Sequence, residues 1–277
     1  MAEITAAAVK ELREKCGLPM MDCKKALGES DGDVDAAIQW LRERGAQILA
    51  KRADRETTYG RFGIYTSIAG GQGAMVELMC ESASVTQNEE FIQLANDMAQ
   101  QLATGPGAAD GDELLEQPSP SKDGLTLVEQ RNELFNRIRE VFNIGRIIRI
   151  DGSCGGYSHN ATTVSGVLLE VEGGNDDAAR DVCMHIAAMR PAALAISEIP
   201  EDEVQKERSI LREAALAEGK SEDIVDKMVD GRIRNYFAER VLSEQQYVKG
   251  DKETVSEFAA EHGMTLKKFV LWELGDS

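Results

Sequence analysis

The sequence predicts an α+β protein in which three short helices precede two related units of sheet and helix. Apolar residues recur at helical spacing through the first fifty residues, and the period becomes strand-like alternation after residue 55. A strand-strand-helix pattern then occurs twice. Its apolar helix positions match at a constant offset of 88 residues, with Leu94, Ala95, Met98 and Ala99 against Val182, Cys183, Ile186 and Ala187.

These patterns divide the chain into three parts. Residues 1–54 form a three-helix domain, residues 55–143 a first α+β subdomain, and residues 144–277 a second. Three helices in so few residues bury only a small core. Such a module is typical of binding rather than of chemistry, so we interpret residues 1–54 as a partner-binding domain.

Composition limits the possible functions. The chain has 277 residues and a net charge of −18, which repels phosphate backbones, so we expect no direct nucleic-acid partner. No apolar run approaches the 18 or more residues of a membrane span, so no membrane partner is expected. The five cysteines are scattered without a CxxC pair, a pattern typical of a reducing cytoplasm rather than of a metal site.

The helices of the first domain have clear start and stop signals. Residues 4–15 predict a helix that Gly17 ends, and residues 20–29 predict a second. Asp33 can cap a third helix, which Gly45 is expected to end.

In the first subdomain, residues 59–69 and 74–80 predict a β-hairpin around a glycine-rich turn. A helix over residues 88–103 follows, with Asn88 as its N-cap. Residues 104–125 are rich in proline, glycine and serine and predict a flexible surface insert. A helix over residues 127–143 completes this subdomain.

In the second subdomain, residues 146–151 and 164–171 predict strands around a plain glycine-rich turn, and residues 176–190 predict a helix. Two further helical patterns, 203–217 and 222–237, predict a protruding αα-hairpin at about 203–237. In that hairpin Ser221 is a fitting N-cap, and an apolar stripe begins at Ile224. Residues 271–275 alternate like an edge strand.

The two copies differ where strand meets helix. Only residues 172–175 intervene in the second copy, whereas the first has residues 81–88. A lengthened loop on a rigid scaffold is a place to look for function.

A search for chemistry finds no catalytic motif. The patterns GxxxxGK[ST], GxSxG and HExxH are absent from the sequence. His185 lies among apolar helix neighbours and is interpreted as a helix-flank residue rather than a catalyst. We therefore expect no enzyme activity and no cofactor.

The most distinctive motif is MMDCKKAL, residues 20–27. Two consecutive methionines at a helix start cannot both face one core, and an exposed methionine is adaptable partner-binding material. Lys24 and Lys25 add a basic spot to an acidic chain. The alternative is that Met21 packs on the first helix and the lysines are simply solvated.

Residues 4–45 resemble the N-terminal signature of the bacterial translation elongation factor Ts family. They read ITAAAVKELREKCGLPMMDCKKALGESDGDVDAAIQWLRERG. Residues 157–173 resemble the family's Tyr-x-His strand segment, and DIVDKMVDGRIRNYF and LSEQQYVKGDKETVSEF resemble its helical hairpin and the segment after it. The resemblance covers nearly the whole chain except residues 104–125.

The resemblance implies a guanine-nucleotide exchange factor that binds elongation factor Tu and distorts its nucleotide and magnesium site. It also implies a ubiquitin-associated-like N-terminal domain, two related α+β subdomains and a helical hairpin. The partner-binding residues it implies are Met20, Met21, Asp22, Lys24, Lys25, Tyr157 and His159.

The resemblance places the exchange loop, which displaces the partner's magnesium, at Ser82, Ala83, Ser84 and Val85. The family's motif there is Thr-Asp-Phe-Val-like. A hydroxyl and the valine are kept, but the aspartate falls on Ala83 and the phenylalanine on Ser84. Exchange would then depend more on rigid-body strain than on a wedge. The alternative is a binding-only adaptor or holding factor that has lost efficient exchange.

Overall fold

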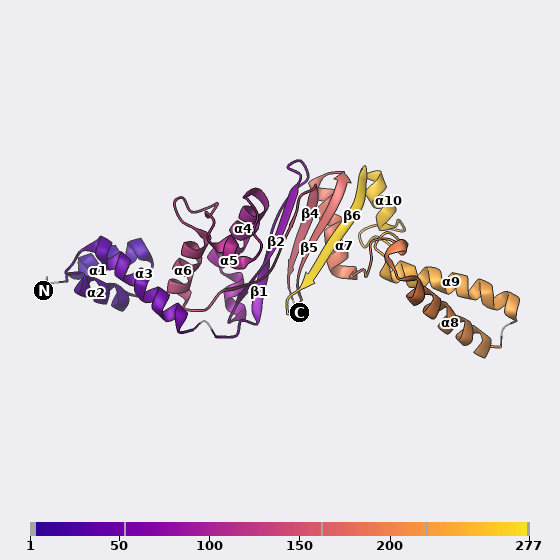
Figure 1. The fold of residues 1–277 in the computed structure, drawn as a ribbon, viewed down its shortest axis with the longest axis horizontal. Helices are drawn as coiled ribbons and strands as arrows, with labels where there is room; N and C mark the ends of the chain where they lie inside the picture. Colours follow the sequence, from indigo (N-terminus) through magenta and orange to yellow (C-terminus); the bar gives the residue numbers. More distant parts are fainter. Residues whose placement is uncertain (1–3, 53, 162, 220, 276–277) are drawn as a thin grey trace. The chain divides into compact units, whose positions relative to one another are not determined.

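The fold is that of a computed structural model, which describes residues 4–52, 54–161, 163–219 and 221–275 (Figure 1). Its helices and two three-stranded sheets confirm the predicted α+β class. The described residues fall into two compact units. One lies within 1–65, 74–149 and 274–277, and the other within 66–73 and 150–273.

Three helices open the first unit: α1 (Ala6–Cys16), α2 (Met20–Glu29) and α3 (Val34–Ala50). The Asp33 side chain accepts a hydrogen bond from the Ala36 N–H and caps α3, as the sequence predicts. The helices enclose a small apolar core of Val9, Leu12, Leu18, Cys23, Ala26, Leu27, Ala37 and Leu41.

The prediction that Gly45 ends the third helix is wrong, because α3 continues to Ala50. Gly45 is buried, and a Cβ added there would collide with the side-chain amide of Asn136. Beyond it, Ile48 and Leu49 pack against the core of the first sheet. The glycine therefore permits a close helix crossing rather than a stop.

The first sheet contains β1 (Tyr59–Ser67), β2 (Gln72–Cys80) and β3 (Asn143–Ile150), in the order β1-β2-β3. One apolar core joins β2 to α4 (Glu89–Thr104), α5 (Gly111–Leu115) and α6 (Leu127–Ile138). The Asn88 side chain caps α4 by accepting hydrogen bonds from the N–H groups of Glu90 and Phe91. This cap confirms the sequence prediction.

The insert at residues 104–125 is packed against the first unit more closely than its composition predicts. Its short helix α5 buries Leu114 and Leu115 in the core of the first sheet. The hydroxyl of Ser121 donates to the buried carboxylate of Asp97 on α4. The prediction rests on the proline, glycine and serine content of the segment, which does not show that Leu114 and Leu115 are buried.

The predicted hairpin of the second copy is also wrong, because β3 belongs to the first sheet. Its place is taken by β4 (Cys154–Asn160), which pairs antiparallel with β5 (Val164–Gly173). Two glycines near the start of β4 have low β-propensity, so the sequence pattern does not indicate a strand there. Gly155 lies against Ala179, where a side chain would clash. The repeated units are therefore β1-β2-α4 and β4-β5-α7, with α7 at Asp176–Met189.

The second sheet is completed by β6 (Met264–Glu273), in the order β4-β5-β6. This is the edge strand that the sequence predicts, although it begins well before residue 271. The helix α10 (Val255–Glu261) leads into it, and a 3₁₀ turn, η2 (Ile196–Glu198), follows α7. The core of this unit joins α7, α10 and the sheet.

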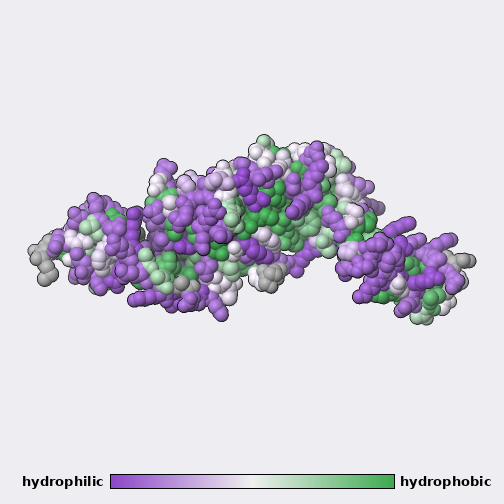
Figure 2. Space-filling model, in the orientation of Figure 1, coloured by the Kyte–Doolittle hydropathy of each residue, from purple (hydrophilic) through white to green (hydrophobic). Residues whose placement is uncertain are grey.

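The predicted αα-hairpin is formed by α8 (Glu201–Ala217) and α9 (Glu222–Arg240). Val225 and Val229 are buried against Ala215. Ile224 is exposed, so it does not belong to the buried stripe, and Ser221 occupies the N-cap without a side-chain capping bond. In the face shown in Figure 2, hydrophilic residues cover most of α1–α3 and of this hairpin. In the described part of the chain, no helix is both long enough and apolar enough to cross a membrane.

Candidate partner-binding surface and loop

The helix α2 turns both of its methionines outward. Met20 is 53% exposed and Met21 is 72% exposed, whereas Cys23, Ala26 and Leu27 face the core. Pro19 at the N-cap fixes the helix start, so the two methionines occupy its first turn. The alternative in which Met21 packs on the first helix is therefore wrong.

The two lysines of the motif have different surroundings. Both are exposed, but the ammonium of Lys25 lies 5.9 Å from the ring centre of Trp40 on α3. The guanidinium of Arg44 lies 5.1 Å from the same ring. Cation–π attraction therefore draws Lys25 toward α3, whereas Lys24 is exposed on α2.

Asp22 has an intramolecular partner that the sequence does not reveal. Its carboxylate lies 2.8 Å from the guanidinium of Arg139, and both side chains are largely covered. Arg139 ends α6 in the left-handed conformation, with φ of 67°. Asp22 therefore ties α2 to the end of α6.

The polar strip after β2 has a defined conformation. Residues Ala83–Gln87 form a short 3₁₀ helix, η1, and Val85 is buried in the core of the first sheet. Ala83 and Ser84 are exposed. The two positions that depart from the expected loop motif therefore both face solvent.

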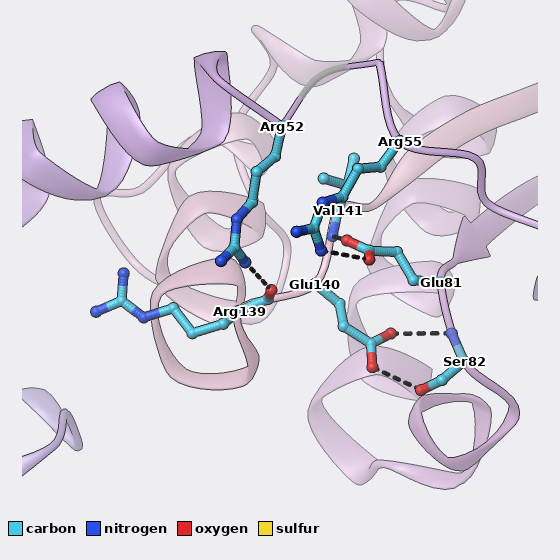
Figure 3. Close-up of polar contacts among 7 residues, drawn as sticks. All are labelled: Arg52, Arg55, Glu81, Ser82, Arg139, Glu140 and Val141. Carbon is cyan, nitrogen blue, oxygen red and sulfur yellow. Dashed lines mark hydrogen bonds and ion pairs between the residues drawn. The ribbon is translucent and has the colours of Figure 1, made fainter.

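Polar contacts hold the start of this strip (Figure 3). The carboxylate of Glu140 accepts hydrogen bonds from the Ser82 N–H at 3.0 Å and from the Ser82 hydroxyl at 2.6 Å. Glu81 accepts a hydrogen bond from the Val141 N–H at 2.8 Å and pairs with Arg55 at 2.9 Å. Three segments meet here: the end of β2, the chain after α6, and the segment after α3 that carries Arg55.

The electrostatics of this cluster favour an ionised Glu81 carboxylate and a neutral Cys80 thiol. Desolvation acts to raise the pKa of Glu81, but the Val141 N–H and the Arg55 guanidinium outweigh it and lower that pKa. Burial, aided by the nearby Glu140 charge, raises the pKa of the Cys80 thiol to about 12. Cys80 therefore stays protonated and is no nucleophile.

Tyr157 and His159 lie on β4 in the second unit, and the Tyr157 hydroxyl is 3.0 Å from Nδ1 of His159. Both line a cavity of about 310 Å³ whose other walls include Met184 and Val248. The predicted residues therefore lie at two surfaces, one in each unit.

His185 is buried, so its interpretation as a helix-flank residue is wrong. Its Nδ1 lies 3.3 Å from the Val248 N–H, and its Nε2 lies 2.9 Å from Oε1 of Gln245. Because a backbone amide can only donate, Nδ1 accepts and Nε2 carries the proton. Burial lowers the pKa of His185, although the Gln245 bond acts in the opposite direction. The residue therefore serves as a neutral core histidine.

Within residues 4–52, 54–161, 163–219 and 221–275, no group of three or more His, Cys, Asp or Glu side chains is arranged to hold a metal ion. The pair Cys16 and Cys23 has its sulfur atoms 3.6 Å apart, with Cys23 buried in the three-helix core. The two thiols pack as small side chains.

Comparison with known proteins identifies relatives along nearly the whole chain. The family model described as "Elongation factor TS" matches residues 81–276. The protein named "Elongation factor Ts" from Thioalkalivibrio sulfidiphilus (strain HL-EbGR7) is 38% identical over 277 residues, which covers 99% of this chain and 92% of that protein. This second match includes the three N-terminal helices that the family match leaves out.

Proposed function

Because this chain belongs to the elongation factor Ts family of translation elongation factors, we propose that it binds GDP-bound elongation factor Tu and promotes exchange of GDP for GTP. The observation that carries the proposal is the outward-facing pair of methionines on α2, in the same helix as the exposed Lys24. This role places the protein in the cytoplasm, where translation occurs.

The α2 surface supplies the kind of contact that such binding needs. A methionine side chain that becomes fully buried contributes about 1.5–3 kcal/mol, so Met20 and Met21 together provide a substantial apolar anchor. The flexible thioether of a methionine side chain adapts to the partner's shape. Tyr157 and His159 offer a second contact region on β4.

The proposed exchange needs no bond-making residue. The factor binds nucleotide-free partner more tightly than GDP-bound partner, and GDP weakens factor binding by the same factor. A hundredfold coupling corresponds to about 2.7 kcal/mol. A few contacts that exist only in the nucleotide-free complex supply that free energy.

The loop after β2 is the proposed exchange element. Ser82, Ala83, Ser84 and Val85 stand where the family resemblance places a Thr-Asp-Phe-Val-like motif. Ala83 and Ser84 are exposed but small, so they cannot act as a charged or aromatic wedge. Strain transmitted through the contact surfaces on α2 and β4 therefore contributes more to GDP release than insertion of this loop into the partner's nucleotide site does.

The test is stopped-flow release of fluorescent GDP from elongation factor Tu of the same source. We expect the release rate to rise with added protein and to saturate. The variant Met20→Ala/Met21→Ala should need a much higher concentration for half-saturation, while its helix content stays that of the wild type. No acceleration at saturating protein refutes the exchange proposal.

The missing acid and aromatic groups at Ala83 and Ser84 favour one second candidate, a binding-only adaptor for elongation factor Tu. Capture of the partner without faster GDP release would support it. Because both assays use the same two proteins, one set of samples separates the candidates.

A further inference from the structure

We propose that Glu140 is a positioning residue, which holds loop 82–87 in the conformation that acts on the partner's nucleotide site. The inference rests on the proposed exchange function and assigns that function a group outside the loop. Glu140 lies 58 residues from Ser82 in the sequence, just after α6.

The contact between Glu140 and the loop is one half of a pair of contacts, the clasp, that joins residues 81–82 to residues 140–141. The Glu140 carboxylate accepts hydrogen bonds from the N–H and hydroxyl of Ser82, and the Glu81 carboxylate accepts one from the Val141 N–H. Two adjacent residues of each segment are therefore joined to two adjacent residues of the other, as Figure 3 shows. Hydrogen bonds to a carboxylate are stronger than those between neutral groups.

The chain on either side of Glu140 is fixed, so its carboxylate is a rigid support. Before it, the Arg139 N–H donates to the Phe135 carbonyl at 2.7 Å, and Arg52 donates to the Arg139 carbonyl at 2.6 Å. After it, Val141 and Phe142 are buried in the core of the first sheet.

Two hydroxyl hydrogen bonds in series connect Glu140 to the exposed part of the loop. Ser82 has one hydroxyl proton, and the 2.6 Å distance to Glu140 shows where it points. The Ser84 hydroxyl, 3.1 Å from that of Ser82, must then be the donor between the two. The order Ser84 to Ser82 to Glu140 therefore orients the side chain that stands in the family's phenylalanine position.

Loop 82–87 has one apolar anchor, Val85, which is buried on the core. Ala83 and Ser84 lie between that anchor and the clasp and are exposed. Their position therefore depends on both ends being held. Removing the Glu140 contact loosens the loop at Ser82, while Val85 keeps the loop attached to the core.

The variants Glu140→Gln and Ser82→Ala test this. An amide at position 140 keeps one oxygen acceptor, so one of the two Ser82 bonds is lost along with the charge. We expect the maximal GDP-release rate to fall about tenfold in each variant, with the half-saturating concentration changed by less than about twofold. The losses in the double variant should not add fully, because both changes weaken the same contact between Ser82 and residue 140.

Two control variants separate positioning from general damage. Ser82→Thr keeps the hydroxyl and should retain most of the release rate. Glu56→Gln makes the same acid-to-amide change at an exposed position of the same unit and should behave as the wild type. Unchanged release in Glu140→Gln and Ser82→Ala overturns the proposal, and so does a loss that appears equally in Glu56→Gln.

Hydrogen exchange measured by mass spectrometry gives a second readout without the partner. The Ser82 amide donates to Glu140, so the peptide covering residues 81–88 should exchange faster in Glu140→Gln, while a peptide within α7 should not change. If the wild-type protein does not speed GDP release from elongation factor Tu, the proposed function fails. The hydrogen-exchange measurement then decides by itself whether Glu140 fixes the loop. Identical exchange in variant and wild type overturns the positioning role.

Discussion

Replacing Leu114 by alanine should strongly destabilise the first unit, because the insert that carries this leucine is part of the core. Leu114 is fully buried on α5 and shares a core with α4 and α6. Removing three carbon groups at about 0.8 kcal/mol each costs about 2.4 kcal/mol of burial. The cavity left behind raises the expected loss of unfolding free energy to about 3 kcal/mol.

The matched control is Leu216→Ala, which makes the same change at a residue 44% exposed on α8. Its expected cost is about 0.5 kcal/mol or less. Urea denaturation followed by far-UV circular dichroism measures both variants. Hydrogen exchange of the α4 peptide then identifies the unit that was weakened. A cost below about 1 kcal/mol for Leu114→Ala would refute the packed insert and favour a segment that rests loosely on the surface.

Three further predictions address the loop, the thiols and the buried histidine. Ala83→Asp with Ser84→Phe should speed GDP release at little cost in stability, because both positions are exposed; an unchanged or slower rate in stopped flow counts against the loop assignment. A maleimide should label Cys16 first in the folded protein, because the other four cysteines are buried, and peptide mass spectrometry would contradict this if a buried thiol reacts as fast. The unfolding free energy should fall as pH drops below about 6.5, because the unfolded chain then binds a proton that buried His185, with its lowered pKa, resists. His185→Gln should flatten that dependence in urea titrations at several pH values, and an unaltered slope would contradict the assignment.

Local signals in the sequence predict much of the secondary structure. The caps at Asp33 and Asn88 form as expected, since an N-cap depends only on the next few residues. The failures occur where distant packing decides the outcome. Gly45 lies within its helix where Asn136 leaves no room for a side chain, and Gly155 lies within β4 where Ala179 of α7 leaves none.

The candidate site divides in the same way. Two adjacent methionines in one helix turn predict an exposed apolar surface, and the structure places both side chains in solvent. The bonds from Asp22 to Arg139 and from Ser82 to Glu140 span 117 and 58 residues of sequence. No local pattern connects such positions, because charged residues are abundant throughout this acidic chain. The bonds from Ser82 to Glu140 hold the strip after β2 in place, although nothing in its own residues indicates this.

Isothermal titration of elongation factor Tu with this protein, at increasing GDP concentration, tests the central claim most directly. An exchange factor must bind nucleotide-free partner more tightly than GDP-bound partner, so the apparent Kd should rise with GDP and level off. We predict a plateau about a hundredfold above the nucleotide-free value, which corresponds to about 2.7 kcal/mol of coupling. A Kd that GDP does not change would contradict the exchange function and leave only a binding role.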